Sequence, residues 1–122
     1  MQAARSKIAV VDDDDAVRES LSFLLSIAGH PVMDFGSAEE FLQCGALDQV
    51  RGLILDHHMP CISGLELAAR LRAGGWQLPI LLITGVPSPA IVARVEELGI
   101  EQVLEKPPAE ADIMAFIDGL GG

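Results

Sequence analysis

The sequence predicts an α/β fold: a five-stranded parallel sheet with helices on both faces, in the doubly wound (βα)5 arrangement. Short, mostly apolar runs bounded by Gly, Pro or charge recur five times in the 122 residues. Stretches with helical spacing of apolar residues lie between and after these runs. Strict alternation of strands and helices implies right-handed crossovers and a parallel sheet. The predicted strands are Lys7–Val11, Pro31–Phe35, Val50–Leu55, Leu78–Ile83 and Ile100–Leu104.

Capping residues indicate where the helices begin and end. Asp14 can cap the first helix, and Ser88 precedes Pro89, a residue that suits the first helical position. Ser37 and Ser63 each stand three residues before a Glu, which is the spacing of a capping box. Glycine accepts the left-handed conformation at a helix C-terminus, and glycines stand where each of the first four helices should end. These are Gly29, Gly45, Gly74-Gly75 and Gly99.

Length and composition predict one domain over residues 1–122, with an ordered core at about 6–118 and the possible start of a linker at 119–122. No apolar stretch approaches the roughly 20 residues that span a bilayer, so we expect a soluble, cytoplasmic protein without membrane contact. The net charge of −10 argues against direct binding of nucleic acid or anionic lipid. Cys44 and Cys61 have neither metal-ligand spacing nor a secretory context, and we expect free thiols.

Polar residues follow four of the predicted strands at the points where the strands end. They are Asp12, Asp13, Asp56, Thr84 and Lys106. In a doubly wound sheet, ligands bind at the carboxyl ends of the strands, near the point where the strand order reverses. The sequence therefore predicts one pocket that contains all five side chains.

Three carboxylates held close together repel one another, and a divalent cation resolves the conflict. Oxygen donors suit Mg²⁺, and Mn²⁺ accepts the same donors. We predict Asp13 and Asp56 as direct ligands, Asp12 as a ligand through water, and the backbone carbonyl of His58 as a further ligand. The second carboxylate oxygen of Asp56 is then free as a nucleophile, with Lys106 and Thr84 placed to stabilise a phosphoryl group. The predicted product is an aspartyl phosphate.

These motifs resemble the receiver domain of two-component response regulators over nearly the whole chain. Four segments in order carry the resemblance. They are Val10-Val11-Asp12-Asp13, Leu53-Ile54-Leu55-Asp56 with Met59-Pro60 and Gly64, Ile83-Thr84-Gly85, and Glu105-Lys106-Pro107. Within the family, the segment from Met59 to Leu67 is most similar to the FixJ-like branch, whose members usually carry a DNA-binding helix-turn-helix domain.

The resemblance implies a CheY-like (flavodoxin-like) sheet with strand order 2-1-3-4-5. It implies phosphorylation of Asp56 by a histidine kinase or phosphotransfer protein, followed by a shift of the last helices and strand that changes partner contacts. No enzymatic activity is expected beyond self-phosphorylation and self-dephosphorylation. The family often has a cis peptide at the Lys106-Pro107 bond, and a small residue at the position of Gly85. An output domain beyond Gly122, and a homodimer through the fourth helix and fifth strand, are left open.

Three positions depart from the family pattern. Val103 stands where the family usually has Phe or Tyr, whose ring swings inward on activation. The segment Val86-Pro87-Ser88-Pro89 has two prolines where a mobile loop is expected, and Pro108 replaces a bulky apolar residue. We hypothesise that phosphorylation changes this domain less than its relatives, or by another route.

Three alternatives fit parts of the sequence. A degenerate receiver would act by protein binding alone, but the acidic pair, acceptor, Thr and Lys are intact. A Mg²⁺-dependent phosphohydrolase with an Asp nucleophile would normally have a second Asp at position 58, where this chain has His58. A zinc site of His57, His58 and Cys61 is disfavoured because adjacent residues in an extended segment point in opposite directions.

Overall fold

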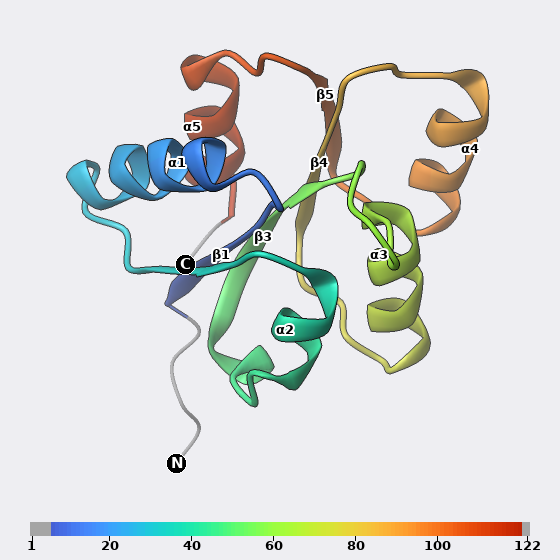
Figure 1. The fold of residues 1–122 in the computed structure, drawn as a ribbon, viewed down its shortest axis with the longest axis horizontal. Coiled ribbons are helices and arrows are strands. Elements are labelled where there is room, and N and C mark those ends of the chain that lie inside the picture. The colour runs from blue at the N-terminus through green and yellow to red at the C-terminus, as the bar shows by residue number, and fades with distance from the viewer. Residues whose placement is uncertain (1–5, 121–122) are drawn as a thin grey trace.

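The computed structural model describes residues 6–120, which form five parallel strands in the order β2-β1-β3-β4-β5, surrounded by helices (Figure 1). The predicted fold and strand order are confirmed. The strands are β1 (Lys7–Val11), β2 (Val32–Phe35), β3 (Val50–Asp56), β4 (Ile80–Thr84) and β5 (Gln102–Glu105). The helices are α1 (Asp15–Ile27), α2 (Ala38–Gln43), α3 (Gly64–Ala73), α4 (Pro89–Glu97) and α5 (Glu110–Asp118), and a 3-10 helix (Leu47–Gln49) precedes β3.

Helices cover both faces of the sheet, α1 and α5 on one face and α2, α3 and α4 on the other (Figure 1). Successive strand residues point to opposite faces, so each strand supplies both layers. In β1, Ile8 and Val10 pack with buried residues of α1 and α5, whereas Ala9 and Val11 pack with those of α2, α3 and α4. All four are fully buried. The central strands are therefore apolar on both faces, which leaves their ends as the places for polar chemistry.

Capping explains the helix boundaries much as the sequence predicts. The Asp14 carboxylate accepts from the amides of Ala16 and Val17, and Ser37, Ser63 and Ser88 each accept one amide of the helix that follows. One detail differs from a capping box: the Glu40 carboxylate accepts from the amide of Gly36 instead of Ser37. Four of the predicted glycine stops have positive φ, namely Gly29, Gly45, Gly75 and Gly99.

Three strands begin one or two residues later than predicted. The first residue of β4 is Ile80 instead of Leu78, because Pro79 between them has no amide hydrogen to pair. Its carbonyl still accepts from the amide of Leu53. The difference affects the amino ends of the strands, at the edge of the sheet opposite the predicted pocket.

Side-chain packing extends two residues beyond residue 118, the predicted end of the ordered core. Leu120 packs against the core between the sheet and α1 and α5, and its side chain covers Gly52 on β3. A Cβ atom on Gly52 would lie 2.7 Å from Leu120 Cδ1, so the glycine makes room for this contact. Residues 119–122 are the predicted possible start of a linker. Gly119 is the C-cap of α5, and residues 121–122 lie outside the described residues.

Two further expectations concern the cysteines and the membrane. Cys44 and Cys61 are free, as predicted; Cys44 caps α2 and Cys61 is exposed in the loop before α3. Between residues 6 and 120, none of the helices has the length and apolar character that crossing a bilayer requires.

Candidate functional site at the carboxyl ends of the strands

The sheet register brings the predicted site residues to one edge. Val11 pairs with Leu55, so the next residues, Asp12 and Asp56, lie side by side at the ends of β1 and β3. Thr84 ends β4, and Lys106 directly follows β5. Asp12 and Asp56 are each 2% exposed and Thr84 is fully buried, an unusual degree of burial for carboxylates.

Asp12 is held at its amide, at its carbonyl and at one carboxylate oxygen. Its amide donates to the carbonyl of Phe35, which continues the ladder between β1 and β2. Its carboxylate Oδ1 accepts from the amide of Asp14 at 2.9 Å. Its carbonyl accepts from Nη1 of Arg18 at 2.7 Å. The loop that carries the acidic pair is therefore held in one conformation.

Asp56 lies against the only ammonium group that the described residues bring to this edge. Lys106 Nζ is 2.7 Å from Asp56 Oδ1, and the two side chains form an ion pair. Oδ2 of the same carboxylate is buried and has no hydrogen-bond partner among residues 6–120. An ionised oxygen buried without a partner is costly, and a bound cation would remove that cost.

Three carboxylates form a donor set of the kind that a hard cation prefers. Oxygens of Asp12, Asp13 and Asp56 lie within 4.8 Å of one another. Burial raises the pKa of the Asp12 carboxyl, and the charges of Asp56 and Asp13 add to this rise against the opposing effects of the Asp14 amide and Lys106. Because Asp13 is exposed, an ion and its waters can reach the cluster. The residues fit a divalent metal.

The electrostatics of Lys106 reflect the same cluster. Burial lowers the pKa of its ammonium group, but close contact with Asp56 and the charges of Asp12 and Asp13 outweigh burial, so the pKa lies above its ordinary value. Lys106 is therefore a permanent positive charge at neutral pH. Its ammonium group can balance the negative charge of a group bound at Asp56.

The Thr84 hydroxyl contacts the ring of His58, a residue for which the sequence predicts a role only through its backbone carbonyl. Its oxygen accepts from the amide of Val86 at 3.3 Å, and His58 Nε2 lies 3.3 Å from the same oxygen. The rings of His57 and His58 lie edge to face, with centroids 5.0 Å apart. The two rings therefore do not point in opposite directions, contrary to the prediction for an extended segment, because both residues lie beyond the end of β3. The acidic cluster is the metal-competent group among residues 6–120, and neither histidine nor Cys61 belongs to it.

Close backbone packing places the end of β3 against α3. A Cβ atom on Gly64 would lie 2.5 Å from the carbonyl oxygen of Asp56 and 2.8 Å from the Cα of His57. The amide of Gly64 donates to the carbonyl of His57. Gly64 therefore lets the first turn of α3 pack directly on the residue that ends β3.

The remaining predicted positions lie where the sequence puts them. The Lys106-Pro107 peptide is cis, as expected from the resemblance. Val103 is half-buried on β5 and packs on the core side that α2, α3 and α4 cover. Gly85 follows Thr84, and a Cβ atom there would meet nothing within 4 Å. Pro108 lines a hollow of about 330 Å³ between α1 and α5.

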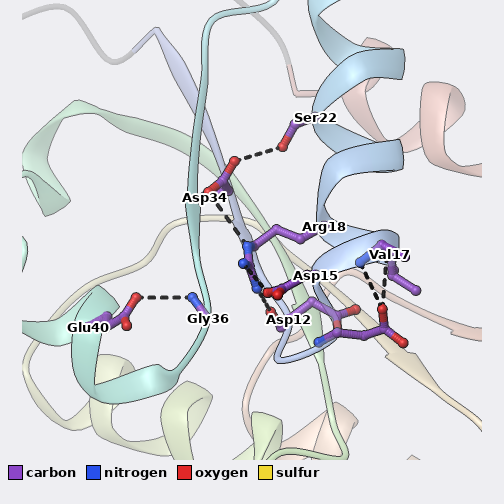
Figure 2. Close-up of polar contacts among 10 residues, drawn as sticks. Asp12, Asp15, Val17, Arg18, Ser22, Asp34, Gly36 and Glu40 are labelled. Carbon is purple, nitrogen blue, oxygen red and sulfur yellow. Dashed lines mark hydrogen bonds and ion pairs between the residues drawn. The ribbon is translucent and has the colours of Figure 1, made fainter.

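Arg18 is a residue that sequence reasoning missed. It stands four residues after the cap Asp14, on the first turns of α1, and reaches back to the Asp12 carbonyl (Figure 2). Its guanidinium also contacts Asp15 and Asp34. One indication was available, because residues four apart on a helix are neighbours and an arginine there can reach the capping loop.

The strand order and the acidic pocket at the ends of β1 and β3 define a CheY-like α/β domain with a metal-competent site. The chain belongs to a family within this class: the model of the response regulator receiver domain matches residues 8–118. It is thus a receiver domain of the two-component response regulators, a signalling domain.

Similar proteins agree with this assignment. The chain is 40% identical over 110 residues to the transcriptional regulatory protein FixJ of Azorhizobium caulinodans, covering 90% of this chain and 52% of that protein. It is 39% identical over 114 residues to the response regulator MprA of Mycobacterium leprae, covering 93% and 50%. The chain thus spans about half the length of these relatives.

Solved structures agree as well. The FixJ-N crystal structure has a TM-score of 0.81 at 32% identity, covering 98% of this chain and 94% of that chain. The chemotaxis protein CheY4 of Vibrio cholerae has a TM-score of 0.86 at 25% identity, covering 97% and 100%.

Proposed function

We propose that Asp56 is the phosphoacceptor of this receiver domain, and that a Mg²⁺ ion, or Mn²⁺ in its place, is held by Asp12, Asp13, Asp56 and the backbone carbonyl of His58. One observation carries the proposal. The Asp56 carboxylate is buried with Lys106 at 2.7 Å on one oxygen and no hydrogen-bond partner for the other. A purely structural aspartate at a strand end would have its second oxygen satisfied as well.

The side chains present can carry out phosphoryl transfer without an added base. An oxygen of Asp56 attacks the donor's phosphorus, and the bond from phosphorus to the leaving group breaks as the new P–O bond forms. The leaving group departs with the electron pair, as acetate from acetyl phosphate, or as neutral imidazole from a phosphohistidine whose other ring nitrogen already carries a proton. Lys106 balances the negative charge gained, and the Thr84 hydroxyl retains a proton to donate to a phosphoryl oxygen. A bound Mg²⁺ would supply further charge compensation there.

The partners follow from the family and the relatives. We propose a histidine kinase or phosphotransfer protein as the donor. Since FixJ is a transcriptional regulatory protein about twice as long as this chain, a transcriptional output domain is the proposed target of the signal. The net charge of −10 supports a DNA contact made by that other domain and not by this one. We also propose that the chain acts as one domain, without catalysis beyond its own phosphorylation and dephosphorylation.

Intact-mass measurement after incubation with acetyl phosphate and Mg²⁺ tests the proposal. The protein should gain one phosphoryl group, and the gain should vanish in Asp56→Asn or when the metal is chelated. Asp48→Asn is the matched control, because Asp48 is exposed in the 3-10 helix before the amino end of β3. It should be phosphorylated like the unmodified protein. Failure of the unmodified protein to gain mass would favour a receiver that acts by protein binding alone.

A further inference from the structure

Arg18 joins the acidic loop to two neighbouring elements through one mostly buried side chain. Its Nη1 donates to the carbonyl of Asp12 at 2.7 Å, and its Nη2 lies 2.5 Å from Asp15 Oδ1. Nε lies 3.6 Å from Asp34 on β2, and the other oxygen of Asp34 accepts from Ser22 of α1 at 3.1 Å (Figure 2). The side chain of Arg18 is only 18% exposed. A long side chain with this many contacts loses its rotamer freedom and is a rigid support.

The carbonyl that Arg18 holds belongs to the peptide that joins Asp12 to Asp13. The orientation of this peptide plane sets where the Asp13 side chain leaves the backbone. Asp13 has no hydrogen bond of its own among residues 6–120, whereas Asp12 is tied at its amide and its carboxylate. The bond from Arg18 is therefore the contact that fixes Asp13 relative to Asp12 and Asp56.

We infer that Arg18 is a positioning residue for the divalent-metal site: it preorganises the Asp12–Asp13 peptide so that both carboxylates face Asp56. This inference rests on the proposed function, since it concerns the proposed Mg²⁺ site. It assigns to α1 a part in metal binding through a residue that does not touch the ion. Outer residues that orient metal ligands are worth about 10- to 100-fold in affinity in well-studied sites.

An electrostatic role and a positioning role of Arg18 predict opposite changes in Mg²⁺ affinity when Arg18 is removed. Its positive charge lies near the acidic cluster and repels a divalent cation, so Coulomb forces alone predict tighter Mg²⁺ binding without it. Part of this repulsion is cancelled by the carboxylates of Asp15 and Asp34. If Arg18 acts by positioning, its removal weakens Mg²⁺ binding instead. The sign of the change separates the two roles.

Calorimetric titration of the metal-free protein with Mg²⁺ is the test. Arg18→Met should weaken Mg²⁺ binding by about tenfold. Arg18→Lys, which retains the charge and one donor for the carbonyl, should fall between Arg18→Met and the unmodified protein. Arg94→Met is the matched control, because Arg94 forms an ion pair of the same i,i+3 kind on α4. It should leave the affinity unchanged.

Two further readouts exclude a loss of fold. Amide spectra of metal-free Arg18→Met and Arg18→Lys should shift at Asp13 and Asp14 while the amides of β3 and β4 stay in place. The Mg²⁺ concentration for half-maximal phosphorylation should rise about tenfold, with the rate at saturating Mg²⁺ close to that of the unmodified protein.

Unchanged or tighter binding in both Arg18 variants, while the unmodified protein binds Mg²⁺, would overturn the positioning role and leave the proposed function standing. Spectral changes spread over β3 and β4 in both variants would also overturn it, because Arg18 would then support the fold as a whole. Absence of Mg²⁺ binding by the unmodified protein would overturn both proposals together.

Discussion

Lys106 Nζ lies 2.7 Å from Oδ1 of Asp56, although β4 lies between β3, which Asp56 ends, and β5, which Lys106 directly follows. The lysine reaches across the end of β4, where Thr84 is fully buried. Asp56 thus receives one positive charge from the chain itself. The ammonium group of Lys106 and any metal ion bound at the site therefore interact with the same carboxylate.

Removal of the Lys106 charge should therefore strengthen metal binding. In Lys106→Met, Mg²⁺ no longer competes with an ammonium group, and since the lysine is partly exposed we expect the affinity to rise only about two- to fivefold. Calorimetric titration measures the change. The matched control is Lys7→Met at the amino end of β1, the opposite end of the sheet, where the affinity should stay the same. A weaker affinity in Lys106→Met would show that the lysine supports the site and does not compete within it.

Substitution of Gly64 and of Gly85 by alanine provides a second test, because the added Cβ atom has very different surroundings at the two positions. In Gly64→Ala the new Cβ would lie 2.5 Å from the Asp56 carbonyl, so the backbone at Asp56 must shift, at a cost of about 1–3 kcal/mol. In Gly85→Ala the Cβ meets nothing within 4 Å, and stability should change little. Urea unfolding gives both free energies, and phosphorylation by acetyl phosphate should be slower in Gly64→Ala. Equal stability of the two variants would contradict this account of the contact between α3 and β3.

Most of the fold could be predicted from the sequence because its determinants are local. The alternation of apolar runs, the caps at Asp14 and Ser88 and the glycine stops act over a few residues, and the structure confirms them. The grouping of Asp12, Asp13 and Asp56 could also be predicted, since parallel strands bring their carboxyl ends to one edge.

Long side chains that reach another element could not be predicted. Arg18 resembles any arginine on the polar face of a helix until its contact with the Asp12 carbonyl is known. The contact between His58 and Thr84 depends on how the chain turns after β3, which no residue pattern sets. Such contacts are set by tertiary packing, and they decide how the site is supported.

Arg72 is another long side chain of this kind, and it yields a third prediction, about stability. Its guanidinium donates to four carbonyls, those of Trp76, Leu78, Leu98 and Gly99, and so ties α3 to the start of β4 and the end of α4. Arg72→Met leaves these carbonyls without a donor, and because three of the four contacts are partly buried we expect a loss of about 1–3 kcal/mol in the free energy of unfolding.

The control for Arg72 is Arg94→Met. The ion pair of Arg94 with Glu97 is exposed on both sides, at 46% and 62%, so the substitution should cost less than about 1 kcal/mol. Urea unfolding of both variants at one pH measures the difference. If the two variants lose similar free energies of unfolding, the carbonyl contacts of Arg72 stabilise the fold no more than an exposed ion pair does.

The last prediction concerns how an event at Asp56 reaches α4. Val103 has no ring to swing inward, Pro87 and Pro89 restrict the loop after Thr84, and the Thr84 hydroxyl already contacts His58. We therefore expect beryllofluoride, an analogue of the phosphoryl group, to shift amide signals around Asp56, Thr84 and Lys106 but only weakly along α4. In Val103→Phe, a ring between β5 and α4 should extend the shifts into α4, because its movement would couple the two. Large shifts throughout α4 in the unmodified protein would contradict the hypothesis, and would mean that the Thr84 loop transmits the change without an aromatic residue.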